Sequence, residues 1–385
     1  NEQQDFIGSA PESFIAMVKL KPAKKYLKDF FLIEDGEPVY QENDIMLAAS
    51  YLRKLRIKYG MPVVIVLGLG SGSGDRAGGS PLAQHLDALG QYVGQCVVVC
   101  SGNEGNERLH YSGRVEDGKS EDVEIRVGEN SNGFVLELWG NTPDLFSVSF
   151  VSPLGESVPR IPARKDVSER VNFLLEGTYI DVDYKLVESG NGGELIFMRF
   201  VNPSPGIWTI KVYGSFILSG RFNIWSNLRQ FMDSETYFLK PDPDMTLTVP
   251  ASSEGVITVG GFDNNSNAIY PRTGRGFTND NNVKPDFVAP SVNVFGPDVG
   301  RGAEISGGFT RKTGTSVGAA LVAGCCAQML EWGVVDANEP YMKTAYIKNY
   351  LIRGAQRDRD VTYPSRQWGF GKIDVFNSFL ILTRT

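Results

Sequence analysis

The sequence is poor in histidine, in cysteine and in runs of one charge, and each shortage excludes a class of protein. Two histidines and four cysteines in 385 residues, with no Cys-x-x-Cys pair, do not make a structural zinc site. The net charge is −7, and no cluster of Lys and Arg is present to bind nucleic acid or an anionic membrane. No apolar stretch is as long as a membrane span.

The spacing of the cysteines argues against a disulfide scaffold. Cys96 and Cys100 fall on one predicted strand, too far apart to bond, while the neighbours Cys325 and Cys326 point to different faces of a predicted helix. The pattern predicts free thiols and suits a reducing or anaerobic setting, although a bond between the two pairs stays open.

Hydrophobic residues make up 42% of the sequence, which is enough for a large core and two domains. The first hundred residues alternate predicted strands with predicted helices. The strands are 13–20, 62–69 and 96–101, and the helices are 42–59 and one opened by Ser80-Pro81. This series predicts a doubly wound α/β fold around a parallel sheet, with ligands at the carboxyl ends of the strands.

The pattern changes between about residues 114 and 249, where short apolar or alternating runs recur every eight to twelve residues or so. These runs are 123–127, 134–139, 146–151, 180–187, 194–201, 206–213 and 221–225. They predict an inserted antiparallel β-sandwich of jelly-roll type, because the α/β pattern returns afterwards. The predicted division is 1–113 for the first part of the α/β domain, 114–249 for the insertion and 250–385 for the second part.

The stretch from Gly314 to Gly324 joins a polar turn to an apolar helix, with Ser316 at the join. A helix N-terminus has unpaired N–H groups and a positive dipole end, which favour negative charge developing on a nucleophile. Ser316 taken alone also fits a second interpretation, as an ordinary capping residue of a buried helix.

The stretch resembles the nucleophile motif of the subtilisin-like serine proteases, Gly-Thr-Ser-Met-Ala-(Ala/Ser)-Pro-His-Val-Ala-Gly. Gly314, Thr315, Ser316, Ala319, Val322, Ala323 and Gly324 match in register. Ala320 and Leu321 stand where the family has Pro-His, which are packing positions.

Three further segments resemble the family in the order it requires. Gly102-Asn103-Glu104-Gly105 matches Gly-Asn-Glu-Gly, 284–290 matches Pro-Asp-x-x-Ala-Pro with Ser291 in place of a glycine, and 368–374 matches the closing Gly-x-Gly-x-(Ile/Val)-(Asp/Asn). The insertion between these motifs resembles clostridial members related to the germination-specific Csp proteases.

The resemblance implies a serine endopeptidase acting on polypeptides through an acyl-enzyme. Ser316 is then the nucleophile, Asn103 donates to the oxyanion and Thr315 supports that site. The walls of the pocket for the P1 side chain are Gly68, Leu69 and Gly70 on one side and Cys100, Ser101 and Gly102 on the other. These small residues are expected to leave room for a sizeable P1 side chain.

Residues 7–11, Ile-Gly-Ser-Ala-Pro, resemble the family segment Gly-Val-Ala-Pro. The Asp and His motifs of the family normally precede that segment, and neither motif is found here. His85 falls within a predicted helix, and His110 in a polar loop without an orienting carboxylate nearby. Because the chain also starts at Asn1, we expect it to be the larger part of a cleaved protease. A separate N-terminal fragment, possibly with a pro-domain, would stay docked and carry Asp and His.

Two other functions remain open. A pseudoprotease would keep Ser316 and Asn103 for binding or signalling without catalysis. A dinucleotide-binding enzyme could be built on the loop 68–74, but its glycines never complete Gly-x-Gly-x-x-Gly. No cofactor or metal is expected, and a structural calcium ion is not indicated. Spore-associated and secreted locations both fit.

Overall fold

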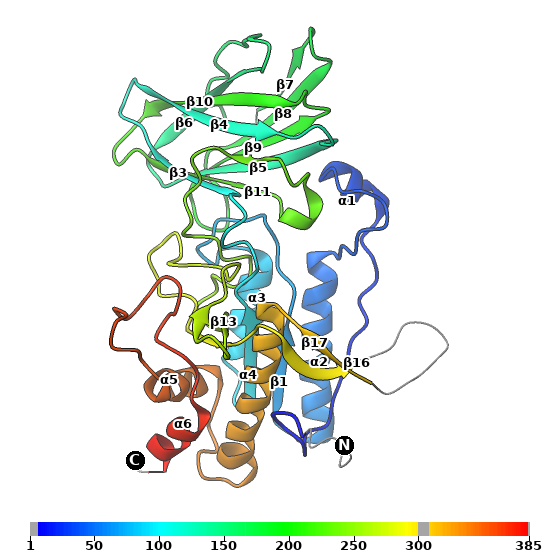
Figure 1. Ribbon diagram of the computed structural model, residues 1–385, viewed down its shortest axis with the longest axis vertical. Coiled ribbons are helices and arrows are strands. Elements are labelled where there is room, and N and C mark those ends of the chain that lie inside the picture. Colours follow the sequence, from blue (N-terminus) through cyan, green and yellow to red (C-terminus); the bar gives the residue numbers. More distant parts are fainter. Residues whose placement is uncertain (1–6, 166, 299–307, 384–385) are drawn as a thin grey trace.

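The computed structural model describes residues 7–165, 167–298 and 308–383. One half of the molecule is an α/β unit and the other is made of antiparallel sheets (Figure 1). The α/β sheet contains parallel strands β1 (Val63–Leu67), β2 (Gln95–Cys100), β13 (Ile257–Asp263) and β15 (Phe287–Pro290), with β14 (Ala268–Ile269) antiparallel to β13. The order is β1-β2-β13, with β14 and β15 both pairing to β13.

Helices cover both faces of this sheet, as expected for a doubly wound fold. They are α2 (Glu42–Tyr59), α3 (Pro81–Gly90), α4 (Thr315–Leu330), α5 (Thr344–Gly354) and α6 (Val375–Leu382). Helix α1 (Lys25–Phe30) lies instead against the antiparallel sheets, where Phe30 stacks on Phe197. Val97 and Val99 of β2 pack towards α2 and α3, while Cys96 and Val98 pack towards α4 and α5. The predicted start of α3 is confirmed, since the Ser80 side chain accepts from the N–H of Ala83 at 3.2 Å.

Helix α4 and the π-helical turn η2 (Glu331–Val335) form one apolar stretch of 21 residues. By length and composition this stretch could cross a membrane, so the expectation that no run reaches that length was wrong. In this fold α4 packs against β1, β2, β13 and β15. Its residues Ala319, Val322 and Met329 are fully buried in the core.

The predicted strand 13–20 is not formed. The segment pairs with no strand among the described residues, and Phe14, Ile15 and Met17 are 85%, 88% and 86% exposed. An apolar run becomes a strand only when a neighbour completes its backbone hydrogen bonds, and the run itself does not reveal whether that neighbour is present.

The chain between β2 and β13 forms two antiparallel sheets. One has the order β3-β11-β5-β9-β8-β7 and the other β12-β4-β10-β6. The strands are β3 (His110–Arg114), β4 (Ser120–Val127), β5 (Gly133–Gly140), β6 (Leu145–Val151), β7 (Ser168–Phe173), β8 (Thr178–Lys185), β9 (Glu194–Val201), β10 (Gly206–Phe216), β11 (Arg221–Ser226) and β12 (Tyr237–Phe238).

The two sheets share one apolar core. Trp208 of β10 contacts Phe173 of β7 and Phe200 of β9 edge to face, with ring centroids 4.9 and 5.9 Å apart. All seven predicted runs in this region are strands, whereas β3, β7 and β12 were not predicted. The expected boundary between residues 113 and 114 falls inside β3.

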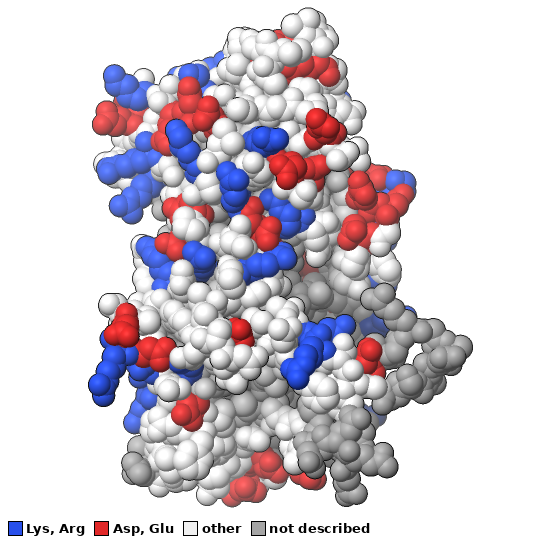
Figure 2. Space-filling view, in the orientation of Figure 1, with Lys and Arg blue, Asp and Glu red and all other residues white. Residues whose placement is uncertain are grey.

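The remaining described elements are short. These elements are the 3-10 turn η1 (Arg229–Phe231) and the antiparallel pair of β16 (Val294–Asp298) and β17 (Gly308–Lys312). All four cysteines are free thiols, as predicted. Lys and Arg lie interspersed with Asp and Glu over the face shown in Figure 2, without a single-sign patch over the antiparallel sheets.

Candidate active site

Ser316 is the second residue of α4, at the carboxyl-terminal edge of the parallel sheet. Its side chain is partly exposed, and its Oγ donates a hydrogen bond to the carbonyl oxygen of Gly68 at 2.9 Å. The thiol of Cys100 lies beside it in the core. Burial raises the pKa of Cys100, and an interaction with Ser316 partly opposes that rise. Ser316 therefore sits where the two predicted P1 walls meet, at the positive end of a buried helix.

The side chain of Asn103 is held by the residue preceding Ser316. Its Oδ1 accepts from the backbone N–H of Thr315 at 3.1 Å and from the Thr315 hydroxyl at 3.4 Å. That hydroxyl also donates to the carbonyl oxygen of Gly102 at 3.1 Å. Within the described ranges Asn103 Nδ2 makes no hydrogen bond, so the acceptor end of the amide is fixed while its donor end is free for another group.

Neither histidine is placed to act on Ser316. His85 Nε2 pairs with the Ser50 hydroxyl of α2 at 3.0 Å. His110 is buried in β3, contrary to the polar loop expected, and both its ring nitrogens are used, by the Asp244 carbonyl oxygen at 2.7 Å and by Asn223 Oδ1 at 3.0 Å. Its ring also stacks on Trp225. Burial lowers the pKa of His110, and the hydrogen bonds to Asn223 and the Asp244 carbonyl oxygen oppose that shift. Its ring is therefore occupied in packing at this junction and does not reach Ser316.

The glycine loop 68–74 packs inward and does not form a phosphate cradle. A β-carbon at Gly68 would lie 3.2 Å from that of Ser316, and one at Gly72 would lie 2.9 Å from the Ser226 carbonyl oxygen. The amides of the α3 N-terminus that follows are taken by the protein's own side chains, since Glu42 Oε1 accepts from the N–H of Leu82 at 2.8 Å. These contacts oppose the dinucleotide interpretation.

Thr248 is a site residue that the sequence analysis missed. It is buried, and its side chain lies against both predicted P1 walls: a β-carbon at Gly70 would collide with it, and one at Gly102 would lie 2.5 Å from its Cγ2. Its Oγ1 has no hydrogen-bond partner in the described chain. The only sequence signal was its place two residues before Pro250, at the return to the α/β pattern.

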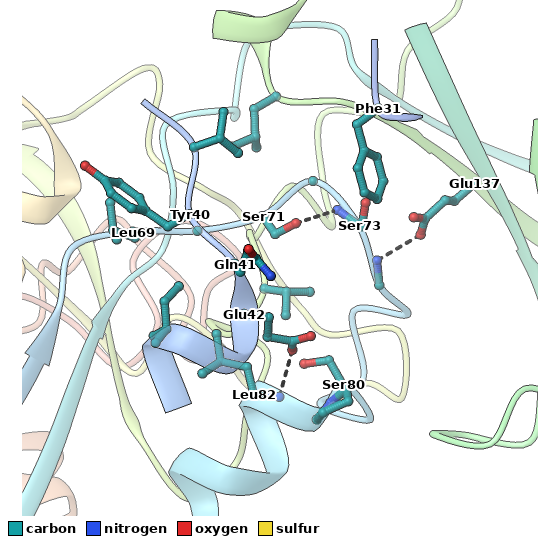
Figure 3. A pocket seen from close by; sticks show the side chains of 18 of the residues that line it. Phe31, Tyr40, Gln41, Glu42, Leu69, Ser71, Ser73, Ser80, Leu82 and Glu137 are labelled. Carbon is teal, nitrogen blue, oxygen red and sulfur yellow. Dashed lines mark hydrogen bonds between the residues drawn. The ribbon is translucent and has the colours of Figure 1, made fainter. Parts of the chain in front are cut away.

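A cavity of about 840 Å³ lies on the other side of the glycine loop 68–74, between α2, α3 and the antiparallel sheets. Figure 3 shows Tyr40 and Leu69 at one end of it and Glu137 at the other. Glu137 of β5 accepts from the backbone N–H of Gly74 at 2.8 Å. In the ranges described, no group of three or more His, Cys, Asp or Glu side chains could hold a metal ion.

Comparison with known proteins agrees with this geometry. The model of the subtilase family, Peptidase_S8, matches residues 236–371. The solved structure of the CspB protease of Clostridium perfringens superposes with a TM-score of 0.82 at 28% identity, covering 91% of this chain and 72% of that one.

Two groups of curated relatives match a shorter part of the chain. Subtilisin-like protease SBT6.1 of Arabidopsis thaliana is 31% identical over 144 residues, which is 36% of this chain and 13% of that protein. Membrane-bound transcription factor site-1 protease of Mus musculus is 33% identical over 144 residues, with 12% of its length matched. The chain thus spans only about an eighth of these relatives. The four motifs, the subtilase model matched over residues 236–371 and the fold shared with CspB make the chain similar to the subtilisin-like proteases, and to the Csp proteases in particular.

Proposed function

We propose that the protein is a serine endopeptidase that forms an acyl-enzyme on Ser316. The observation that carries the proposal is the arrangement at the start of α4, where the Ser316 hydroxyl and the free donor of Asn103 lie at the same helix end. In this proposal Ser316 Oγ attacks the scissile carbonyl carbon and the carbonyl oxygen becomes the oxyanion. Asn103 Nδ2 donates to that oxyanion, and Thr315 holds Asn103 in place.

The proposed chemistry needs a general base that this chain does not supply. A neutral hydroxyl is a weak nucleophile, and both histidines of the chain have other partners. We therefore propose that Asp and His come from a separate upstream polypeptide that docks beside Ser316.

Three surfaces that the described chain leaves uncovered support a docked segment. Strand β1 is bonded to β2 on one edge, and on its other edge no described strand pairs with it. Val66 of β1 is 44% exposed, and Ala320 of α4, one turn after Ser316, is also exposed. The uncovered segment 13–20 is a third such surface. A strand from the partner would satisfy the open edge of β1 and cover these side chains.

The absence of a histidine partner at Ser316 also favours a second candidate, a pseudoprotease. In that case Ser316 Oγ stays bonded to the Gly68 carbonyl oxygen and the cleft binds a polypeptide without cleaving it. For the antiparallel sheets we propose a jelly-roll-like sandwich that acts as a rigid support or partner-binding unit. No cofactor enters either proposal.

Labelling of natively purified protein with a fluorophosphonate probe, followed by peptide mapping, tests the proposal. We expect modification at Ser316, its loss in Ser316→Ala, and a second polypeptide with an Asp and a His on a denaturing gel of the same sample. Labelled protein that runs as this chain alone would contradict the docked fragment. Unlabelled, folded protein that contains the second polypeptide would establish the pseudoprotease instead.

A further inference from the structure

The cavity between the two halves of the molecule has the size and the lining of a small-molecule site. Its volume is about 840 Å³, and ligand pockets in proteins commonly measure about 300 to 1,000 Å³. Apolar side chains line it from both halves, among them Leu27 of α1, Ile45 of α2 and Leu195 of β9. The rings of Phe31 and Trp139 are also part of its wall. Such a lining accommodates the apolar part of a ligand.

The charged side chains in this lining all have the same sign. No Lys, Arg or His is part of the described lining, and its charged members are Glu42, Asp75, Glu137 and Glu188. Arg76 lies nearby but is 4% exposed, and it donates to the carbonyl oxygens of Gly72 and Gly74 on the other side of the loop. The interior of the cavity therefore has a negative potential, which favours a cation.

Two of these carboxyl groups are buried and each has an oxygen without a hydrogen-bond donor. Asp75 is 3% exposed, and its Oδ1 accepts from the N–H groups of Ala77 and Gly79 at 3.1 and 3.3 Å, while Oδ2 has no partner in the described chain. Glu137 is 6% exposed and uses only Oε2 for its described hydrogen bonds. Figure 3 shows Glu137 at one end of the cavity. A buried acceptor without a donor is unfavourable, so a ligand that supplies a donor gains affinity here.

Further acceptors converge on Asp75 where loops of the two halves touch. A β-carbon at Gly79, before α3, would lie 2.6 Å from Asp75 Oδ2 and 3.0 Å from the carbonyl oxygen of Gly190, between β8 and β9. A β-carbon at Gly190 would lie 2.6 Å from the Gly79 carbonyl oxygen and 2.8 Å from Glu188 Oε2. Two carboxylates and two carbonyl oxygens thus lie close together, and such a group of acceptors suits a cation that carries several N–H donors.

We infer that the Asp75–Glu137 end of this cavity binds an organic cation, whose ammonium or guanidinium group donates to these carboxylates and whose aliphatic stem lies along the apolar wall. Trp139 Nε1 donates to Glu137 at 3.0 Å, so an aromatic ring lies beside the proposed position of the charge. The inference goes beyond the proposed endopeptidase function and holds equally for a pseudoprotease. A free amine and a Lys or Arg side chain of a polypeptide share this chemistry.

Isothermal titration calorimetry of the natively purified protein tests the site with a matched pair of probes. Butylguanidinium and butylurea have the same stem and a planar head of the same shape, but only the first is charged. We expect butylguanidinium to bind at least about tenfold more tightly and to raise the melting temperature. The acetylated, amidated peptide Gly-Arg-Gly distinguishes the sources. Tighter binding by the peptide than by butylguanidinium supports a polypeptide side chain as the ligand, and weaker binding supports a free cation.

Two variants assign the binding to this end of the cavity. Asp75→Asn keeps an acceptor for the Ala77 and Gly79 N–H groups but replaces the free oxygen with a donor, so butylguanidinium should bind roughly tenfold or more weakly. Glu188→Gln removes a second charge and should weaken binding roughly threefold or more. Glu129→Gln, at an exposed carboxylate of the antiparallel unit outside the lining, should bind as wild type does. Circular dichroism melting establishes that each variant is folded.

Three results would overturn the inference. Equal affinities for butylguanidinium and butylurea, or no binding of either, would show that the cavity does not select an organic cation. Unchanged affinity in both Asp75→Asn and Glu188→Gln would place the binding elsewhere. A rise in melting temperature with calcium chloride that Asp75→Asn abolishes, without one for butylguanidinium, would make the site a metal site instead.

Discussion

The amide oxygen and the amide nitrogen of Asn103 have different roles, and a substitution can remove one role and keep the other. Its Oδ1 accepts from the Thr315 N–H, while its Nδ2 is the proposed oxyanion donor. Asn103→Asp keeps the acceptor and removes the donor. We expect kcat on a peptide substrate to fall about 10²- to 10³-fold with little change in KM or melting temperature. The exposed Asn106→Asp in the same loop is the control. An unchanged kcat in Asn103→Asp would remove Asn103 from the oxyanion site.

A buried carboxyl in the antiparallel sheets gives the protein a pH-dependent stability. Glu194 of β9 is 1% exposed, and its Oε2 accepts from the N–H of Phe146 at 2.6 Å while Oε1 has no partner in the described residues. Burial raises the pKa of Glu194 from 4.5 to about 8. The folded state therefore holds this proton more tightly than the unfolded state does, and stability falls as pH rises from about 4.5 to 8.

Urea unfolding of wild type and Glu194→Gln at pH 5 and pH 8 measures this effect. At roughly 1.4 kcal/mol per pKa unit, wild type should lose about 3 to 5 kcal/mol relative to the variant over that interval. Glu169→Gln, at an exposed position of β7, should keep the wild-type pH profile. Parallel profiles for wild type and Glu194→Gln would mean that Glu194 is ionised in the folded protein.

At one of the positions where helix α4 departs from the family motif, a second departure 27 residues earlier in the chain compensates for the change. Gly318 stands where the motif has alanine, and Ser291 stands where the family has glycine. The structure brings them together, because a β-carbon at Gly318 would collide with Ser291 Oγ. Ser291 is fully buried and donates to the Ala289 carbonyl oxygen at 3.0 Å. The family's alanine side chain on the helix is absent at Gly318, and the side chain of Ser291, in the loop after β15, occupies that space instead.

This exchange predicts non-additive stabilities. Gly318→Ala raises helix propensity by about 1 kcal/mol, but overpacking against Ser291 should outweigh that gain and destabilise the protein by about 1 to 3 kcal/mol. Gly318→Ala combined with Ser291→Gly restores the family pattern and should be more stable than Gly318→Ala alone. A thermodynamic cycle from urea unfolding of the four proteins measures the coupling. Additive effects would show that the two sites do not share this space.

The elements that the sequence predicted are those whose signals are local. Helix α2, the Ser80-Pro81 start of α3 and strand β2 depend on periodicity, capping chemistry and continuous apolar runs, all visible in a short window. The same rule led to the error at 13–20, since its missing partner is not a local property. Thr248 and the Gly318–Ser291 exchange were invisible for a related reason, because each depends on residues brought together from distant parts of the chain.

The two halves of the molecule meet at the glycine loop that is predicted to form one P1 wall. The antiparallel sheets hold this loop through Glu137, which accepts from the Gly74 N–H at 2.8 Å (Figure 3). Glu137 also accepts from Trp139 Nε1 at 3.0 Å. Arg76, buried at the same junction, donates to the carbonyl oxygens of Gly72 and Gly74. Burial lowers the pKa of Arg76 to about 10, and the negative charge of Glu137 opposes that shift.

Glu137→Gln therefore tests whether the antiparallel unit supports the cleft. The variant keeps an acceptor for Gly74 but removes one of the three carboxylate charges that oppose the pKa shift of buried Arg76, and it should lower the free energy of unfolding by about 1 to 3 kcal/mol. Hydrogen exchange of the amides in 70–78 should quicken, and kcat/KM should fall mainly through KM as the P1 wall loosens. The exposed Glu129→Gln in the same unit is the control. Hydrogen exchange in 70–78 that stayed at its wild-type rate while global stability fell would mean that Glu137 stabilises only its own sheet. The backbone hydrogen bonds of Thr248 and Val249 would then be the contacts that keep the wall rigid.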